Sequence, residues 1–159
     1  MHLSPIENGL LKAKWPGRFE KISDNPMVII DGAHNPDAAS RLRETIDREY
    51  ANTEFVYIMG VLGDKDYTEV IKTMADRAEF IVTVTPPNPR ALEASELREA
   101  IAKVNKNVYS AASIEEAYGM ALDRLNGLSG FSAILAFGSL SYLGDFRNVV
   151  RRMEDVNRQ

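Results

Sequence analysis

Four short polar segments hold the side chains best suited to chemistry, and each of them follows an apolar run. They are residues 31–37 (DGAHNPD), 60–66 (GVLGDKD), 85–90 (TPPNPR) and 138–139 (GS). In the first segment an acidic residue, Asp31, and an imidazole, His34, converge on the start of a helix, which suits the binding of a phosphate or a carboxylate. The planar guanidinium of Arg90 matches the same anions. These residue types predict an anion-binding site.

A purely structural interpretation of each segment stays open. Three residues can simply cap the helices that follow them, namely Asn35, Asp66 and Ser139. Arg90 can be a solvated side chain on a proline-rich spacer. Capping does not explain Asp31 and His34 together. The glycines of residues 60–66 fit neither GxxxxGK[ST] nor GxGxxG, so the segment is neither an independent P-loop nor a dinucleotide fingerprint.

The elements that must position these segments alternate along the chain. Apolar runs predict strands over residues 19–23, 27–30, 55–59, 80–84, 108–109 and 133–137. Helical spacing and caps predict helices over residues 4–14, 36–46, 67–74, 97–104, 114–125 and 143–153, with a Ser113–Glu116 capping box. Continuous apolar strands are typical of a sheet covered on both faces. We therefore predict an α/β fold with a doubly wound, mostly parallel Rossmann-like sheet and one antiparallel N-terminal edge strand. In such sheets ligands bind beyond the carboxyl ends of the strands.

Composition limits the classes of function. The chain has 159 residues, enough for one domain, and a net charge of −4, which offers no electrostatic footprint for nucleic acid. It has no cysteine and only two histidines, His2 and His34, so no metal constellation is expected. The longest apolar runs have about five residues, too few for a membrane span or a signal peptide. We expect a cytoplasmic protein.

Two motifs together resemble the signatures of the folylpolyglutamate synthase and dihydrofolate synthase family. They are Trp15-Pro16-Gly17-Arg18 and Asp31-Gly32-Ala33-His34-Asn35-Pro36. Three further segments follow in the order and spacing of that family's C-terminal domain, namely Gly63-Asp64-Lys65-Asp66, Asn88-Pro89-Arg90-Ala91 and Phe137-Gly138-Ser139-Leu140. The resemblance covers roughly residues 11–147. The related Mur ligases share the fold and a version of the Asp-His-Asn segment.

The resemblance implies an ATP-dependent ligase. Such an enzyme converts a carboxyl group of folate or pteroate into an acyl phosphate, which the amino group of L-glutamate attacks to give an amide and ADP. By the same resemblance Arg18 and Asp31 contact ATP, and His34 and Ser139 contact glutamate. Possible loop contacts without an assigned role are Asp64, Lys65, Asp66 and Arg90.

The family's N-terminal ATPase domain, with its P-loop and magnesium ligands, is missing from this sequence. Residues 1–17 are interpreted as a linker from that domain, and residues 18–159 as the Mur ligase-like C-terminal domain. ATP and Mg²⁺ are the implied cofactors, the ATPase domain the partner in cis, and the chain is expected to be a monomer that is catalytically incompetent alone. Two alternatives are a Mur-type or cyanophycin-type peptide ligase domain and a stand-alone nucleotide or amino-acid binding module.

Overall fold

A computed structural model describes residues 18–64 and 66–157. The strands are β1 (Glu20–Asp24), β2 (Met27–Asp31), β3 (Glu54–Gly60), β4 (Ala78–Thr83), β5 (Val108–Ser110) and β6 (Ser132–Gly138). The helices are α2 (Pro36–Glu49), α3 (Tyr67–Met74), the short 3-10 helix η1 (Ala75–Arg77), α4 (Ala94–Ala102), α5 (Ile114–Asn126) and α6 (Leu140–Asn157). The helix expected at residues 4–14 and the first three residues of the Trp-Pro-Gly-Arg motif lie outside the described residues.

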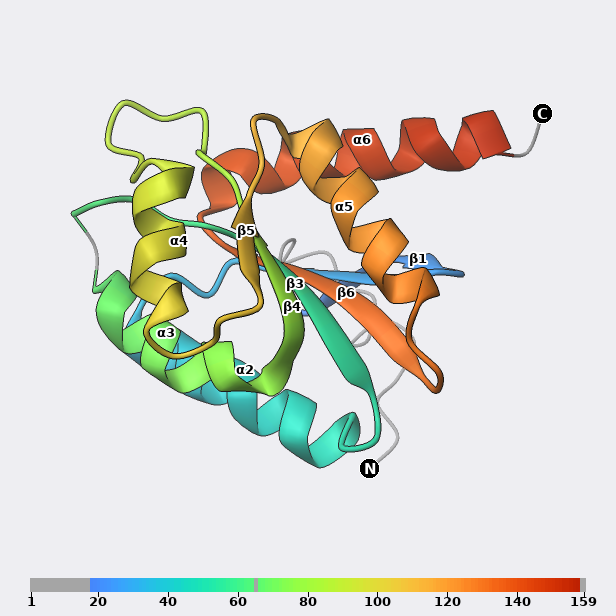
Figure 1. Cartoon of the computed structure of the whole chain (residues 1–159), viewed down its shortest axis with the longest axis horizontal. Coiled ribbons are helices and arrows are strands. Elements are labelled where there is room, and N and C mark those ends of the chain that lie inside the picture. Colours follow the sequence, from blue (N-terminus) through green and yellow to red (C-terminus); the bar gives the residue numbers. More distant parts are fainter. Residues whose placement is uncertain (1–17, 65, 158–159) are drawn as a thin grey trace, which may run out of the picture.

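The six strands form one sheet in the order β1-β2-β6-β3-β4-β5 (Figure 1). β1 pairs antiparallel with β2, and every other neighbouring pair is parallel. The predicted α/β fold with one antiparallel edge strand is confirmed. The last strand in sequence, β6, lies between β2 and β3, so the chain passes over this position after β2 and fills it at the end.

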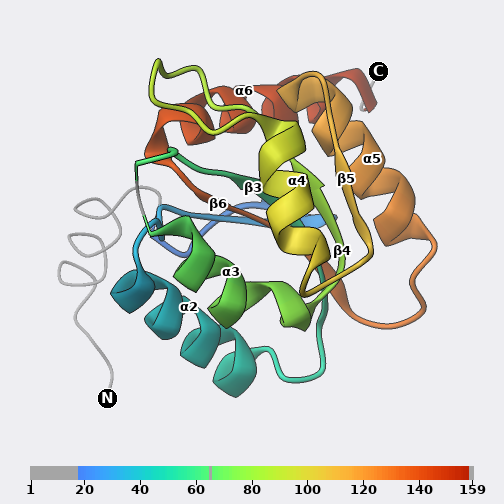
Figure 2. The same cartoon turned by 60° about the vertical axis from the view of Figure 1, so that its left-hand side comes forward.

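Helices cover both faces of the sheet. α2, α3 and α4 pack on one face, and α5 and α6 on the other, as the two views show (Figures 1 and 2). Along β3 the side chains of Phe55, Tyr57 and Met59 belong to the first core, and those of Val56 and Ile58 to the second. All five are fully buried. This double coverage explains why the strands read as continuous apolar runs instead of alternating with polar residues.

The predicted helix caps are confirmed in part. The Asn35 side chain accepts a hydrogen bond from the Ala38 N–H at 2.8 Å, and Ser113 Oγ accepts from the Glu116 N–H at 3.0 Å. The Glu116 carboxylate accepts from the Ala112 N–H at 3.1 Å, so the return bond of the capping box goes to the residue before the cap. Asp66 occupies the N-cap position of α3 without a side-chain cap bond.

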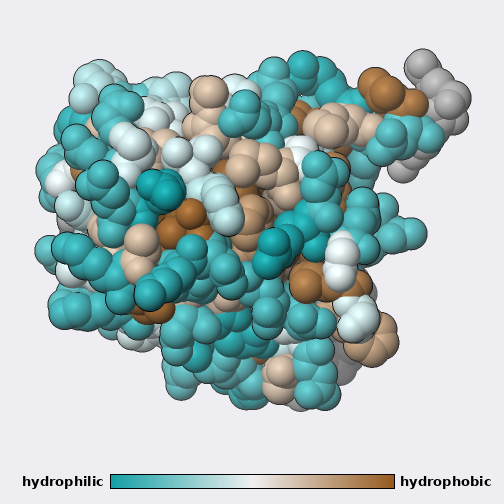
Figure 3. All heavy atoms as spheres, in the orientation of Figure 1, coloured by the Kyte–Doolittle hydropathy of each residue, from teal (hydrophilic) through white to brown (hydrophobic). Residues whose placement is uncertain are grey.

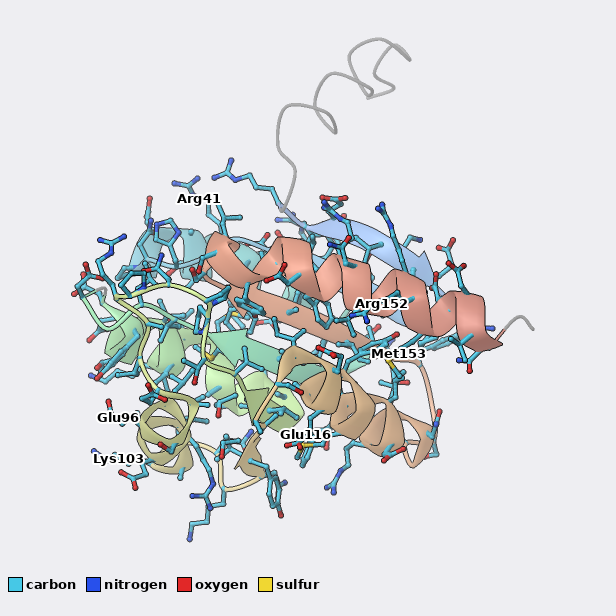
Figure 4. All side chains as sticks on the ribbon, turned by 90° about the horizontal axis from the view of Figure 1, so that it is seen from above. Arg41, Glu96, Lys103, Glu116, Arg152 and Met153 are labelled. Carbon is cyan, nitrogen blue, oxygen red and sulfur yellow. The ribbon has the colours of Figure 1, made fainter. Side chains whose placement is uncertain are left out.

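Hydrophilic residues dominate the surface seen in the orientation of Figure 1, and hydrophobic residues form small separate patches there (Figure 3). Met153, which packs partly buried against the second core, lies between α6 and α5 (Figure 4). Of the helices that the structure describes, none is long and apolar enough to cross a membrane.

Candidate functional site

The carboxyl ends of four parallel strands meet at one edge of the sheet. Asp31 at the end of β2 pairs with Phe137 of β6, and Gly138 pairs with Gly60 at the end of β3. The chain continues from β2 and β3 into helices on one face, but from β6 into α6 on the other face. Loops that leave neighbouring strands in opposite directions open a crevice between them, which is where ligands bind in open α/β sheets.

A pocket of about 290 Å³ lies at this edge. It is lined by His34, Leu62, Asn88, Arg90, Ser139, Leu140 and Ser141, so each of the four polar segments or its direct extension contributes. The structure thus brings together three predicted site residues, His34, Arg90 and Ser139. The other four were not predicted as site residues, although Asn88 belongs to the motif that contains Arg90, and Leu140 to the motif that contains Ser139.

The floor of the site depends on a close approach between β3 and β6. Gly138 has a φ of +116°, and a Cβ added there would collide with the carbonyl oxygen of Gly60. The next residue donates from its N–H to that same carbonyl at 2.9 Å, which places Ser139 at the start of α6. Buried Tyr142 ties α6 to the end of β6, because its hydroxyl donates to the carbonyl oxygen of Phe137 at 2.6 Å. Glycine is therefore required at position 138.

Gly138→Ala should lower the free energy of unfolding of the 159-residue chain by about 2–3 kcal/mol, since the left-handed conformation and the collision are both unfavourable for a side chain. Gly144→Ala is the matched control. Gly144 lies in α6 with open space around its Cα, so alanine should be neutral or stabilise the helix by about 0.5–1 kcal/mol. Urea unfolding of both variants measures the difference. Equal stabilities would show that the β6–α6 connection tolerates a side chain.

Two hydroxyl groups stand at the start of α6. Ser139 Oγ accepts a hydrogen bond from the Ser141 N–H at 3.1 Å and lies 2.6 Å from Ser141 Oγ. Ser139 is almost fully buried and Ser141 is exposed. Ser139 therefore satisfies a free N–H of the first turn, as the capping interpretation requires, while it also lines the pocket.

The contact of His34 with its own loop fixes which ring nitrogen carries the proton. Its Nδ1 lies 2.9 Å from the carbonyl oxygen of Gly32. A carbonyl oxygen can only accept, so in the neutral ring Nδ1 holds the hydrogen and Nε2 holds the lone pair. His34 is exposed and lines the pocket. It can therefore accept a proton at Nε2 or, when charged, donate to an anion.

The loops after β3 and β4 are joined into one wall of the pocket. The Gly63 N–H donates to the Arg90 carbonyl at 2.8 Å, and the Leu92 N–H to the Val61 carbonyl at 3.0 Å. Arg90 Nη1 lies 2.8 Å from Asp64 Oδ2, with both side chains about half exposed. The backbone thus holds Arg90 at the pocket while its guanidinium, which has five N–H donors, remains able to reach a second anion.

Asp31 lies at the end of β2 and does not line this pocket. Its Oδ2 accepts from the Phe19 N–H and its Oδ1 from the Ala33 N–H, both at 2.8 Å. Burial raises the pKa of the Asp31 carboxyl, and the two hydrogen bonds and the positive charge of Arg18 act in the opposite direction. The two residues predicted for the nucleotide are therefore close enough to interact.

Of the remaining predicted loop contacts, Asp66 does not line the pocket. Asp66 is exposed at the start of α3, and Lys65 lies outside the described residues. Within residues 18–64 and 66–157, no three histidine, aspartate or glutamate side chains come together as a metal site.

Comparisons with known proteins agree with the sequence resemblance. The model of the family "Mur ligase, glutamate ligase domain" matches residues 17–140. The dihydrofolate synthase/folylpolyglutamate synthase of Bacillus subtilis is 36% identical over 102 residues, which are 64% of this chain and 24% of that protein. The folylpolyglutamate synthase of Lacticaseibacillus casei is 43% identical over 89 residues, 55% of this chain and 20% of that protein.

A solved structure shows the same fold. The folylpolyglutamate synthase of Mycobacterium tuberculosis, complexed with ADP, has a TM-score of 0.78 at 29% identity, over 84% of this chain and 32% of that chain. The matched part of the chain corresponds to about a quarter of the length of the B. subtilis relative. Since the family model covers residues 17–140, with all four loops up to the start of α6, the chain belongs to the Mur ligase glutamate ligase domain family.

Proposed function

We propose that this chain is the C-terminal domain of an ATP-dependent ligase that joins L-glutamate to a carboxyl group of folate or dihydropteroate. The observation that carries the proposal is the pocket that holds His34, Arg90 and Ser139 at the carboxyl edge of the sheet. Support for the substrates comes from relatives named dihydrofolate synthase and folylpolyglutamate synthase. Imidazole, guanidinium and a helix N-terminus are groups suited to an amino acid with two carboxylates.

The pocket groups have distinct roles in the proposed reaction. The folate carboxylate takes the γ-phosphoryl group of ATP to give an acyl phosphate and ADP, and the glutamate amine then attacks the acyl carbon and releases phosphate. The amine must lose a proton to act as a nucleophile, and in this proposal Nε2 of His34 receives it. The contact of Nδ1 with the Gly32 carbonyl supports this role, because it leaves the lone pair on Nε2. Arg90 and Ser139 hold the carboxylates of the incoming glutamate by charge-assisted hydrogen bonds.

The nucleotide side of the site consists of Arg18 and Asp31. The guanidinium of Arg18 contacts the phosphates, and the Asp31 carboxylate uses its remaining lone pairs to accept from the nucleotide. The M. tuberculosis relative, of which this chain matches 32%, is a complex with ADP, and this supports an adenine nucleotide as a ligand of the whole enzyme. The magnesium ligands and the P-loop belong, in this proposal, to an N-terminal ATPase domain of the same enzyme, so the 159-residue chain alone is expected to be inactive.

The requirement for substrates tests the proposal in the full-length protein. ADP release should depend on L-glutamate together with folate or dihydropteroate, and the product should be one glutamate heavier by mass spectrometry. Dependence on a peptide precursor instead of folate would assign the protein to the Mur-type or cyanophycin-type ligases. Nucleotide binding with no ADP release under any of these conditions would favour a binding module.

Arg90→Ala in the full-length ligase should raise KM for glutamate by about 10-fold to 100-fold, because a hydrogen bond to a charged group is worth about 1.5–3 kcal/mol. Asp64→Asn is the matched control, since it removes only the partner of Arg90 at 2.8 Å. An exposed ion pair contributes about 0–1 kcal/mol, so KM should fall by no more than about fivefold as the competing carboxylate is lost. Steady-state kinetics with glutamate varied at saturating ATP measure both. An equal rise in KM in the two variants would mean that the ion pair only supports the loop.

A further inference from the structure

The Asp31 carboxylate connects two segments that the proposed function assigns to different substrates. The segment 18–19 enters the domain and carries Arg18, and the segment 32–34 leaves β2 and carries His34. One oxygen of Asp31 accepts from the first segment, at Phe19, and the other from the second, at Ala33, each at 2.8 Å. Both carboxylate oxygens thus accept from backbone N–H groups of the chain itself.

The first segment adopts a conformation that needs such a contact. Phe19 has a φ of +42°, in the left-handed region that bulky side chains rarely occupy. Two interactions hold it there, the hydrogen bond from its N–H to Asp31 and the packing of its ring on Tyr50 at 5.5 Å between centroids. The backbone conformation of Phe19 therefore determines the position of its neighbour Arg18 relative to β2.

The second segment is fixed by the other oxygen. Ala33 is buried in the core under α2–α4, and its N–H bond to Asp31 closes a tight turn at the end of β2. The carbonyl of Gly32 within this turn accepts from the His34 ring at 2.9 Å. The turn that Asp31 closes therefore determines where the imidazole stands.

We propose that Asp31 is a positioning residue whose single carboxylate fixes the places of both Arg18 and His34. It thereby couples the nucleotide side of the site to the amino-acid side. The inference rests on the proposed function for the identity of the two substrates, but the contacts of Asp31 do not depend on it. A direct bond from Asp31 to the nucleotide is compatible with this role. The coupling predicts that one substitution at Asp31 affects both substrates, whereas Arg18 and His34 each affect one.

Kinetics of the full-length ligase test the coupling. Asp31→Asn puts an amide N–H₂ opposite one backbone N–H, so one of the two bonds is lost and the turn loosens. KM should rise by about tenfold for ATP and for glutamate alike. In the background of Arg18→Ala, Asp31→Asn should raise KM for ATP by less than it does in the unmodified enzyme, because the part of the effect that acts through Arg18 is already lost, while the glutamate effect persists in full. Asp37→Asn is the control, because this exposed carboxylate, six positions along the chain, pairs with Arg41 at 2.7 Å on the surface of α2; it should change neither KM.

Proteolysis gives a readout that is independent of activity. Trypsin cleaves after arginine, and the left-handed Phe19 resists the extended conformation that a protease requires. Asp31→Asn in the full-length protein should therefore accelerate cleavage after Arg18 by about tenfold, with no increase after Arg124 within α5. If Asp31→Asn does not fold, Asp31→Glu keeps the charge but displaces the carboxylate, and should show the same pattern more weakly.

Three results would overturn the proposal. One is a change in KM for ATP alone that adds to the effect of Arg18→Ala, which would make Asp31 a nucleotide contact only. The others are unchanged values of both KM, or unchanged cleavage after Arg18. If the full-length protein releases no ADP with any substrate, the proposed function fails, whereas the cleavage result still decides whether Asp31 holds the two segments.

Discussion

Replacing Arg18 by alanine in the full-length ligase is expected to lower kcat/KM for ATP by about 30-fold to 1000-fold, because a charged contact that strengthens in the transition state is worth about 2–4 kcal/mol. Arg18 is exposed, and its charge acts on Asp31 at the carboxyl end of β2. The loss should therefore appear in ATP use and not in stability. Truncation of an exposed side chain of this kind changes the free energy of unfolding by about 0.5 kcal/mol or less.

Arg41→Ala is the matched control for this prediction. Arg41 is also an exposed arginine in the N-terminal third of the chain, but it projects from α2 (Figure 4). It pairs with Asp37 at 2.7 Å. ATP kinetics at saturating glutamate and folate should not change in this variant. If Arg18→Ala and Arg41→Ala behave alike, Arg18 does not contact the nucleotide.

Most of the fold is readable from apolar patterning. The limits of the core strands differ from the predicted ones by at most two residues, for example β3 at Glu54–Gly60 against residues 55–59 and β4 at Ala78–Thr83 against residues 80–84. The last helix was predicted over residues 143–153, but α6 covers Leu140–Asn157. The pattern marks the apolar positions from Leu143 to Met153 and misses the first turn, where Leu140 and Ser141 are exposed and Ser139 Oγ accepts from the Ser141 N–H.

The convergence of the four polar segments could also be predicted, because parallel strands place their carboxyl ends at one edge. The contacts within the site could not. Asp31 was expected to contact ATP, and nothing in its sequence context indicates that it accepts from Phe19, twelve positions earlier in the chain. The pairing of Arg90 with Asp64 likewise depends on backbone bonds between two loops. Loop conformations without a helical or strand period leave no pattern from which such pairs can be derived.

His34→Ala has the second large expected effect. Its Nε2 holds the lone pair in the tautomer that the Gly32 carbonyl selects, and it lines the same pocket as Arg90 and Ser139. Proton removal by a positioned base contributes about 100-fold or more to a rate, so kcat/KM for glutamate should fall by at least that factor. The substitution should leave the loop in place, because Asn35 still caps α2 and Pro36 still begins it. The fall in kcat/KM then reports the loss of the imidazole itself.

The central claim is that this pocket serves glutamate and not the nucleotide, and the most direct test is to measure kcat/KM for glutamate and KM for ATP in the full-length ligase with His34→Ala. We predict a fall of about 100-fold or more in the glutamate value, with KM for ATP within about twofold of the unmodified enzyme and an unchanged melting temperature. Equal losses for glutamate and ATP, accompanied by a lower melting temperature, would contradict the account and leave His34 as a residue that only shapes its loop.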